Sequence, residues 1–419
     1  MTATPSPHVS GLDYRASASA RRSGSLVFIV ALSILSGCAS RAFVATPVDQ
    51  AGFLERAVVQ TQQTVRVAAA VPDAKETLAL TGLDLYQQGI QPVWLEVTNL
   101  GEQPVRTAVR SVDENYFSPM EVAWKYRKRL SEKGRADMER WFFENQLPRR
   151  VPAGETRSGF VFTHLAQGTK GFNFDVYSSE SSHNFTFFVP IPGFFADYMD
   201  VDFQSMYEDG DIVRVDTAGL REALKAVPCC SLNASGDSLG DPLNVVIVGT
   251  ALAVRRSLLR AQWQETALNA PETTVARTHR FLGRPPDGTF LKSRPDGSER
   301  KELRLWLAPL LVNDSRVLIG QVSYEMAGAS GVKAYENHRM DPDVDNARDF
   351  LMQNFWYSQS LGALASVGGV PRSSISAPLR NFAGAEYFTD GQRVVLFVSE
   401  NPVAMDQTDI LPWRAVLTD

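Results

Sequence analysis

Cysteine is scarce in this chain of 419 residues, which contains only Cys38, Cys229 and Cys230. No Cys or His close in sequence to the adjacent pair completes a zinc-binding set. Apart from the N-terminal segment, no apolar run has the about 20 residues that cross a bilayer as a helix. A formal net charge of −5 gives no nucleic-acid footprint. The chain also lacks a repeat of fixed period, which excludes a solenoid.

The first 37 residues have the features of a secretory signal peptide. Arg15, Arg21 and Arg22 give a positively charged start. Residues 25–34 form an apolar run that is too short to span a bilayer but suits the core of a signal peptide. The run ends in the sequence Leu35-Ser36-Gly37-Cys38, which matches the lipobox of bacterial lipoproteins.

This motif predicts lipidation of Cys38. We expect cleavage before the cysteine, a diacylglyceryl group on its thiol and a further acyl chain such as palmitate on its amine. Several chains hold firmly, because each buried methylene contributes about 0.8 kcal/mol. Ala39 and Ser40 follow, without Asp, which favours the outer membrane, facing the periplasm, over the inner membrane. The alternatives are an ordinary signal peptide or an uncleaved anchor that happens to carry a cysteine.

Cys229 and Cys230 leave three interpretations open. Consecutive Cα atoms lie about 3.8 Å apart, below the usual disulfide range of about 4.4–6.8 Å, so a bridge between neighbours is strained. An oxidising envelope nevertheless permits one. The two residues are therefore a redox pair, a pair of ligands for a soft metal, or two thiols that pack separately.

The N-terminal half has the pattern of a β-sandwich. Residues 38–80, rich in Ala, Val, Thr and Gln, are expected to form a tether that leads into a first strand. Residues 91–99 alternate apolar and polar side chains and end in a turn signal, and 105–112 is expected to be the return strand. Further short strands are predicted at 158–164, 172–177 and 184–189. The domain at 81–195 thus resembles the immunoglobulin-like domains of envelope proteins.

A helical insertion is expected inside this sandwich. Ser118, Pro119 and Glu121 have the spacing of a capping box with proline at the first helical position. The helix is predicted to continue to residue 133 and to break at Gly134. A second piece should follow at 136–144.

Residues 196–240 are expected to connect this domain to an α/β domain at 241–419. The connector should hold one short helix at 217–226. Residues 242–250 form a buried-type strand, and 251–265 have helical apolar spacing, which together make a βα unit. This unit lacks the phosphate-loop and dinucleotide fingerprints. The predicted fold class is therefore mixed α+β, a sandwich followed by an α/β domain.

Within residues 241–400 the sequence resembles the LssY C-terminal domain family. The resemblance rests on blocks in a fixed order: the strand 243–249, Gly283-Arg284 with Asp287, Arg304-Leu305-Trp306, and His338 with the segment 341–349. Where many members have histidine two positions before the Arg of Arg-x-Trp, this chain has Glu302. Family members are fused to membrane proteins or phosphatase-like domains, which implies envelope or lipid-linked work without naming a reaction.

The acidic segment is the main candidate for chemistry. Asp341, Asp343 and Asp345 alternate, but Asn346 and Met352 stand where a calcium-binding EF-hand loop needs Gly and Glu. Three interpretations stay open: a helix cap at Asp345 with ion pairs around it, a ligand or phosphate site, and a catalytic divalent-metal site. The last two involve the following residues: His338, Asp341, Asp343 and Asp345 as acid/base groups or metal ligands, and Arg284, Arg304 and Arg348 as anion-binding groups.

We therefore expect an envelope lipoprotein that binds a partner protein or an anionic ligand, with no nucleic acid and no required cofactor. The alternative is a hydrolase that acts on a phosphorylated or lipid-linked envelope substrate through residues 338–349, with a divalent metal as one option. A non-enzymatic role is favoured, since the sequence specifies no reaction. Convergence of the candidate residues in one open pocket would support the hydrolase.

Overall fold

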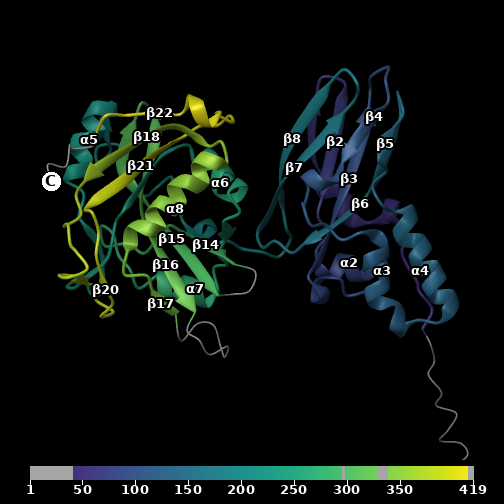
Figure 1. The fold of residues 1–419 in the computed structure, drawn as a ribbon, viewed down its shortest axis with the longest axis horizontal. Helices are drawn as coiled ribbons and strands as arrows, with labels where there is room; N and C mark the ends of the chain where they lie inside the picture. Colours follow the sequence, from purple (N-terminus) through teal and green to yellow (C-terminus); the bar gives the residue numbers. More distant parts are fainter. Residues whose placement is uncertain (1–40, 295–297, 328–337, 414–419) are drawn as a thin grey trace, which may run out of the picture.

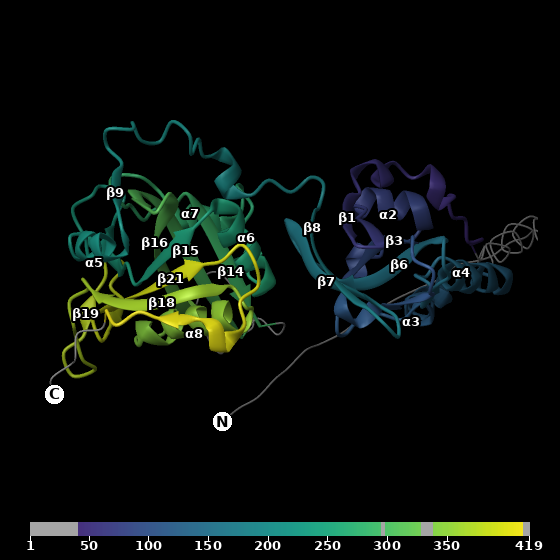
Figure 2. The ribbon, with the colours of Figure 1, turned by 90° about the horizontal axis from the view of Figure 1, so that it is seen from above.

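The computed structural model describes residues 41–294, 298–327 and 338–413, apart from the side chains of Arg129, Ala327 and His338. Two domains, each with its own hydrophobic core, lie side by side and are joined by the segment that follows strand β8 (Figure 1, Figure 2). No helix in these residues is long and apolar enough to cross a membrane. The predicted signal peptide and Cys38 lie outside the described residues.

The N-terminal domain is a β-sandwich of two antiparallel four-stranded sheets. Apolar side chains of both sheets, such as Val67, Leu95, Phe174 and Phe187, form one buried cluster between them, which confirms the sandwich that the alternating pattern predicted. The first sheet has the order β1 (Val58–Gln62), β2 (Val65–Ala70), β3 (Ile90–Asn99) and β6 (Thr156–His164), and the second has the order β5 (Arg150–Val151), β4 (Val105–Ala108), β7 (Thr169–Tyr177) and β8 (Ser182–Pro190).

The segment expected to be a tether is part of the sandwich. It holds β1, β2 and helix α2 (Ala74–Thr81), which begins at a capping box made by Asp73 and Glu76. Val65, Val67 and Ala69 are fully buried. Small alanine side chains give a weak periodic signal, so the packing against β3 decides the strand where the sequence pattern does not.

The predicted hairpin would pair β4 with β3, but the two strands belong to different sheets. After the turn at Gly101 the chain crosses to the other sheet, where β4 pairs with β5 and β7. The helical insertion follows as α3 (Pro119–Tyr126), capped by the side chain of Ser118, and α4 (Glu132–Glu144), capped by that of Ser131. These helices and α2 pack on the outer face of the first sheet.

Gly134 was predicted to break the insertion, but it lies inside α4, and the break falls at 127–131. A Cβ at Gly134 would lie 2.9 Å from the carbonyl oxygen of Arg41. The glycine is therefore required by the close crossing of residues 41–43, and not by the end of a helix.

The C-terminal domain is built on a mixed sheet in the order β13-β14-β15-β16-β12-β21-β18-β22, with β17 beside β16 and β9 beside β15. Helices α6 (Ala251–Arg260) and α8 (Val344–Tyr357) cover one face, and α5 (Thr217–Lys225) packs on the other. The strands are β9 (Val213–Val215), β10 (Cys230–Leu232), β11 (Leu239–Pro242), β12 (Val245–Gly249), β13 (Gln264–Glu265), β14 (Gly288–Ser293), β15 (Glu299–Val312), β16 (Ser315–Ala327), β17 (His338–Met340), β18 (Leu361–Gly368), β19 (Leu379–Arg380), β20 (Glu386–Tyr387), β21 (Gln392–Val398) and β22 (Asp409–Ile410).

The predicted connector at 196–240 belongs to this second domain. Its strand β9 pairs with β15, and Leu220 and Leu224 of α5, one turn apart, are completely buried in the domain core. The predicted helix is present, and so is the βα unit, although α6 ends at Arg260 and not at residue 265. The connector prediction is wrong because this segment lacks strong periodicity, although Leu220 and Leu224 are core residues.

Candidate functional site

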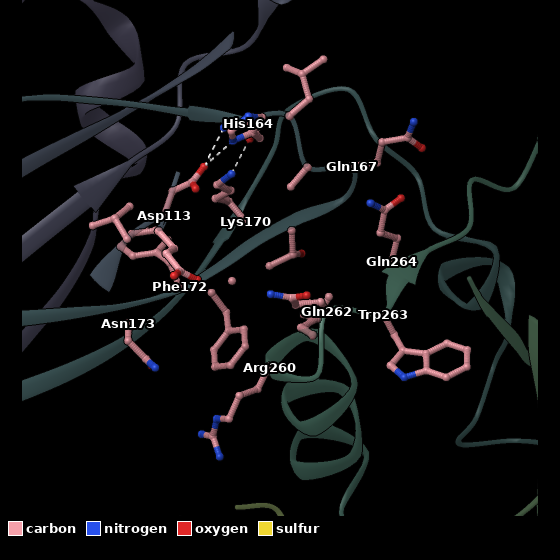
Figure 3. Close-up of a pocket in the computed structure, with 18 of the residues that line it drawn as sticks. Asp113, His164, Gln167, Lys170, Phe172, Asn173, Arg260, Gln262, Trp263 and Gln264 are labelled. Atoms are coloured by element: carbon pink, nitrogen blue, oxygen red, sulfur yellow. Dashed lines mark hydrogen bonds and ion pairs between the residues drawn. The ribbon is translucent and has the colours of Figure 1, made fainter. Parts of the chain in front are cut away.

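A cleft of about 600 Å³ lies where the two domains meet (Figure 3), a size typical of ligand sites. The N-terminal domain contributes the segment 110–115, the end of β6 and the start of β7. The C-terminal domain contributes the end of α6, the residues up to β13 and the end of β14. Residues from both domains therefore line one space.

Lys170, near the start of β7, is the central cation of this cleft. Its side chain is only 7% exposed, and its Nζ donates to the carbonyl oxygen of His164 at 2.6 Å. That is the only hydrogen bond its ammonium makes within the described parts of the chain, although an ammonium can donate three. Burial lowers the pKa of Lys170 to about 8, against the attraction of Asp113. The group is therefore charged at neutral pH and has donors to spare.

Asp113 and His164 form a pair beside Lys170 (Figure 3). The Asp113 carboxylate accepts from the backbone N–H of His164 at 2.8 Å and lies 3.0 Å from its Nδ1. Burial alone would raise the pKa of Asp113, but the hydrogen bonds from His164 and Asn115 lower it. Asp113 is thus an anion that orients the His164 ring, whose side chain is 55% exposed.

The opposite wall carries further basic and amide groups. Arg260 ends α6, and Lys292 donates to the carbonyl oxygen of Ala261 at 2.6 Å and to the Asn354 side chain at 3.0 Å. Burial and the neighbouring Lys301 lower the pKa of Lys292 to about 8. Four basic side chains and two carboxylates line the whole cleft: Arg110, Lys170, Arg260, Lys292, Asp113 and Glu114. The cleft is therefore net positive in a chain whose formal charge is −5.

Polar contacts fix the two domains around this cleft. Arg255 of α6 donates to Thr169 Oγ1 of β7 and to Glu265 Oε1, each at 2.6 Å. Gly171 of β7 lies against Leu259 of α6, where an added Cβ would meet the leucine Cβ at 3.5 Å. The two walls are thus joined by the hydrogen bond from Arg255 to Thr169 and by the packing of Gly171 against Leu259.

The residues predicted for a site in the acidic segment are used in local structure. Asp343, not Asp345, caps α8, and its side chain accepts from the N–H of Asp345 at 3.3 Å. Asp341 accepts from the N–H of Asp343 at 3.0 Å and from the Asn346 amide at 3.3 Å. The predicted cap, Asp345, lies two residues after the observed one, because both aspartates can accept from a free N–H at the start of a helix and the sequence does not distinguish them.

Asp345 instead joins a buried network with Arg348. It accepts from the Thr389 hydroxyl at 2.8 Å and from the N–H of Asp390 at 2.6 Å, and lies 3.0 Å from Arg348 Nη1. Arg348 also bonds both carboxylate oxygens of Asp390, at 2.7 and 3.2 Å. This arginine therefore holds α8 to the segment before β21, which is a structural role in place of the predicted anion-binding one.

Arg304 is enclosed in a polar cluster on β15. It donates to Glu302 at 2.7 Å, Asp241 at 3.2 Å and Gln321 at 2.9 Å, and lies 3.0 Å from His279 Nε2. Burial, and then the Arg304 charge, lowers the pKa of His279 to about 3, so this histidine is neutral. Nε and Nη1 of Arg304 are thus engaged by protein partners, and the residue is only 3% exposed.

Arg284 is likewise committed to protein partners. It bonds Asp287 at 2.7 Å and the Tyr207 hydroxyl and Leu307 carbonyl oxygen at 2.9 Å each. Arg304 is therefore buried, and Arg284, whose side chain is 26% exposed, is engaged by Asp287, Tyr207 and Leu307.

Asp345 and Arg348 lie together, but the predicted site residues do not all come together. His338 pairs with Ala327 in β17, and its side chain is outside the described part of the chain. Arg304 pairs with Gln321, which lies six residues before Ala327 on β16. At about 3.3 Å per residue, the backbone positions of Arg304 and His338 are therefore about 20 Å apart along the strand. In the described ranges no group of three or more His, Cys, Asp or Glu side chains is arranged to hold a metal ion.

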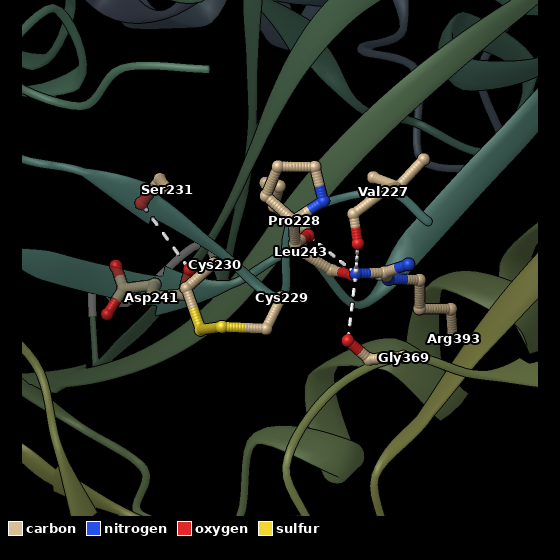
Figure 4. The surroundings of a disulfide bond; sticks show 9 residues. All are labelled: Val227, Pro228, Cys229, Cys230, Ser231, Asp241, Leu243, Gly369 and Arg393. Atoms are coloured by element: carbon tan, nitrogen blue, oxygen red, sulfur yellow. Dashed lines mark hydrogen bonds between the residues drawn. A yellow bond between two sulfur atoms is a disulfide. The ribbon is translucent and has the colours of Figure 1, made fainter. Parts of the chain in front are cut away.

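Cys229 and Cys230 form a disulfide between neighbours, with Cα atoms 3.7 Å apart (Figure 4). Cys230 begins β10 and is buried. Of the three interpretations, the structure therefore has the bridged pair. Arg393 lies beside it and donates to the carbonyl oxygens of Val227 and Pro228.

Sequence reasoning missed the cleft residues. Residues 168–171 have the sequence Gly-Thr-Lys-Gly, which indicates only a turn, and His164 looks like the last residue of a strand. Nothing local marks them, because Asp113, which pairs with His164, and Arg260, on the opposite wall, are distant in sequence. The sequence signal for this site is a basic residue, Lys170, in the turn between the predicted strands 158–164 and 172–177.

Comparison with known proteins bears on the second domain. No curated protein matches the chain. Residues 277–392 match the family model described as LssY C-terminus. The match spans Arg284, Arg304 and Arg348, while most of the cleft lies outside it. Residues 277–392 are therefore similar to the LssY C-terminus family, which agrees with the resemblance of the blocks between Gly283 and Asp349, while the strand 243–249 lies outside the match.

Proposed function

We propose that this protein is an envelope lipoprotein that binds an anionic ligand in the cleft between its two domains. The observation that supports this most directly is Lys170, a buried ammonium with one protein acceptor, in a cleft whose basic side chains outnumber its carboxylates. A buried cation gains most from an anion that accepts its remaining hydrogens, because charge-assisted hydrogen bonds are stronger than neutral ones.

The lining also indicates the kind of ligand. Amide side chains at Gln167, Gln262 and Gln264 can bond a polar body, while Lys170 takes the charged end. Gln262 has a left-handed backbone with φ of 63°, a conformation that costs roughly 1 kcal/mol or more and is enriched at functional sites. A compact anion such as a phosphate or sulfate group on a polar molecule fits these features.

The localisation of the protein is part of the same proposal. Lipid on Cys38 would hold both domains at a membrane surface, with the outer membrane favoured over the inner by the residues that follow the cysteine. The ligand would then be a phosphorylated or otherwise anionic component of the envelope. A partner protein that carries such a group is included in this class.

One observation favours hydrolysis as a second candidate function. Asp113 orients His164, leaving Nε2 available as a base toward water, and Lys170 lies beside the pair. If the protein hydrolyses a phosphorylated substrate, this pair is better placed than the residues around His338 that the sequence suggested.

The binding test uses sulfate and inorganic phosphate as probes in calorimetric titrations. Lys170→Met should weaken binding of both anions by about tenfold or more, since a hydrogen bond to a charged group contributes about 1.5–3 kcal/mol. Lys225→Met, at a half-exposed lysine of α5, is the matched control and should bind like the parent. Equal affinity of the Lys170 variant and the parent would contradict the proposal.

The hydrolytic alternative has a separate readout. Phosphomonoester turnover that disappears in His164→Gln, with sulfate affinity retained, would favour the hydrolase. Sulfate binding without turnover would favour the binding protein.

A further inference from the structure

The tip of the α3–α4 hairpin lies where the chain enters the N-terminal domain. Arg41, the first described residue, forms a parallel bridge with Leu130, and the N–H of Ser131 donates to the Arg41 carbonyl oxygen at 3.1 Å. The beginning of the described chain thus lies against the turn between the two helices (Figure 1). We call residues 124–133 the basic tip.

The basic tip exposes a large aromatic side chain. Trp124 is 60% exposed, and the Arg127 guanidinium carbon lies 3.4 Å from the centroid of its ring. One turn earlier on the same helix face, Met120 is 48% exposed. Tryptophan is enriched where an apolar region meets water, because its ring is apolar and its N–H is polar.

Charge is concentrated at the same place. The basic tip has five basic residues, at positions 125, 127, 128, 129 and 133, and one acidic residue, Glu132. Lys133 pairs with Asp137 at 2.6 Å, whereas Lys125 and Lys128 are exposed and neither forms an ion pair with any side chain that the structure describes. This surplus of positive charge stands in a chain of formal net charge −5, so it is local.

From these features we infer that the basic tip docks on a membrane surface of anionic phospholipid. Lysine and arginine clusters next to a membrane anchor are attracted by anionic headgroups. Cys38 is three residues before Arg41, and three residues span at most about 11 Å. Lipid on Cys38 therefore cannot hold the protein at a membrane without bringing the basic tip close to it.

Docking goes beyond binding in the cleft and does not depend on it. It rests on the proposed anchor only for the position of the membrane. Acyl chains and a basic surface act together as two membrane signals, and the second signal gives the first domain a fixed orientation. Trp124 would enter the headgroup region while the lysines contact phosphates.

The experiment separates the tip from the lipid. The full chain with Cys38→Ala, which cannot be acylated, is sedimented with vesicles of phosphatidylcholine alone or with about a third phosphatidylglycerol. We expect tighter binding to the anionic vesicles, weakened by salt. In this background Lys125→Gln with Lys128→Gln should bind anionic vesicles about 25-fold more weakly, about fivefold for each lysine. Trp124→Ala should weaken binding too.

The matched control is Lys225→Gln with Arg214→Gln, which removes the same charge from exposed positions of the second domain. It should bind like the Cys38→Ala parent. Equal effects of the tip and control variants, equal binding to both kinds of vesicle, or no vesicle binding would overturn the docking surface. Circular dichroism of each variant confirms that the exposed substitutions leave the fold intact. Sulfate affinity of the cleft is unaffected by any of these outcomes, so the two proposals fail independently.

Discussion

Arg393 shows how single buried charges organise the second domain. Its side chain is completely buried and forms no ion pair with the residues that the structure describes. Burial lowers its pKa to about 10, so it remains charged at neutral pH. Its guanidinium donates at 2.6–3.0 Å to five main-chain carbonyl oxygens, those of Leu224, Val227, Pro228, Leu243 and Gly369. One side chain thus joins the end of α5, the disulfide segment and the end of β18.

Arg393→Met should strongly destabilise the protein, because it leaves several buried carbonyl oxygens without donors, at about 1–3 kcal/mol each before relaxation. We expect a net loss of about 3–5 kcal/mol in the free energy of unfolding, measured in urea. Arg372→Met, at an exposed position, should change it by less than about 0.5 kcal/mol. A loss below about 1 kcal/mol for Arg393→Met would show that these bonds contribute little.

At the scale of an element, a few charged side chains fix the position of helix α8. Its start is fixed by the Asp343 cap, and its first turn is fixed to the segment before β21 through Asp345 and Arg348. The acidic residues that suggested metal chemistry are therefore what orients this helix on the sheet.

Two substitutions distinguish the cap from the network. Asp343→Ala should cost about 1 kcal/mol, the usual contribution of a cap. Asp345→Ala should cost more, about 2–3 kcal/mol, since it leaves the Thr389 hydroxyl, the Asp390 N–H and part of Arg348 without an acceptor. Thermal unfolding of the two variants gives the comparison. A larger loss of stability for Asp343→Ala than for Asp345→Ala would contradict these roles of the two aspartates.

At the scale of the whole molecule, the cleft exists only because two domains meet. Arg255 of the second domain, which is paired with Glu265, bonds Thr169 of β7 in the first, and the neighbouring Lys170 lines the same cleft as the end of α6. Neither domain alone has both walls.

The affinity of the cleft for an anion should depend on pH through Lys170. Its pKa is lowered from 10.5 to about 8, so the free protein carries the charge below pH 8 and loses it above. Sulfate does not titrate in this range, and its affinity should be level below about pH 8 and fall toward pH 9.5. Calorimetric titrations at several pH values provide the measurement.

Lys170→Arg supplies the control for this pH effect, because arginine stays protonated throughout. Its sulfate affinity should stay level to pH 9.5. Lys292, whose pKa is also about 8, is the other group that titrates there. If the affinity still falls in the arginine variant, Lys292 and not Lys170 is responsible.

The sequence by itself determined the features that depend on local pattern. Alternation over 91–99 and 172–177 indicated the sandwich, Ser118 and Pro119 indicated the start of α3, and the order of short blocks indicated the LssY C-terminal segment. These signals lie within a few residues of each other, so no knowledge of distant contacts is needed to interpret them.

Tertiary structure alone decided the rest. Residues 65–70 form a strand because β3 lies beside them, and Leu220 and Leu224 are core because they pack against the main sheet. Arg284, Arg304 and Arg348 have the chemistry of anion-binding groups, but acceptors far away in sequence already occupy them. Lys170 differs from these arginines, since the fold buries it with one acceptor among the described residues. The role of a charged side chain depends on the groups around it, and only the fold brings those groups together.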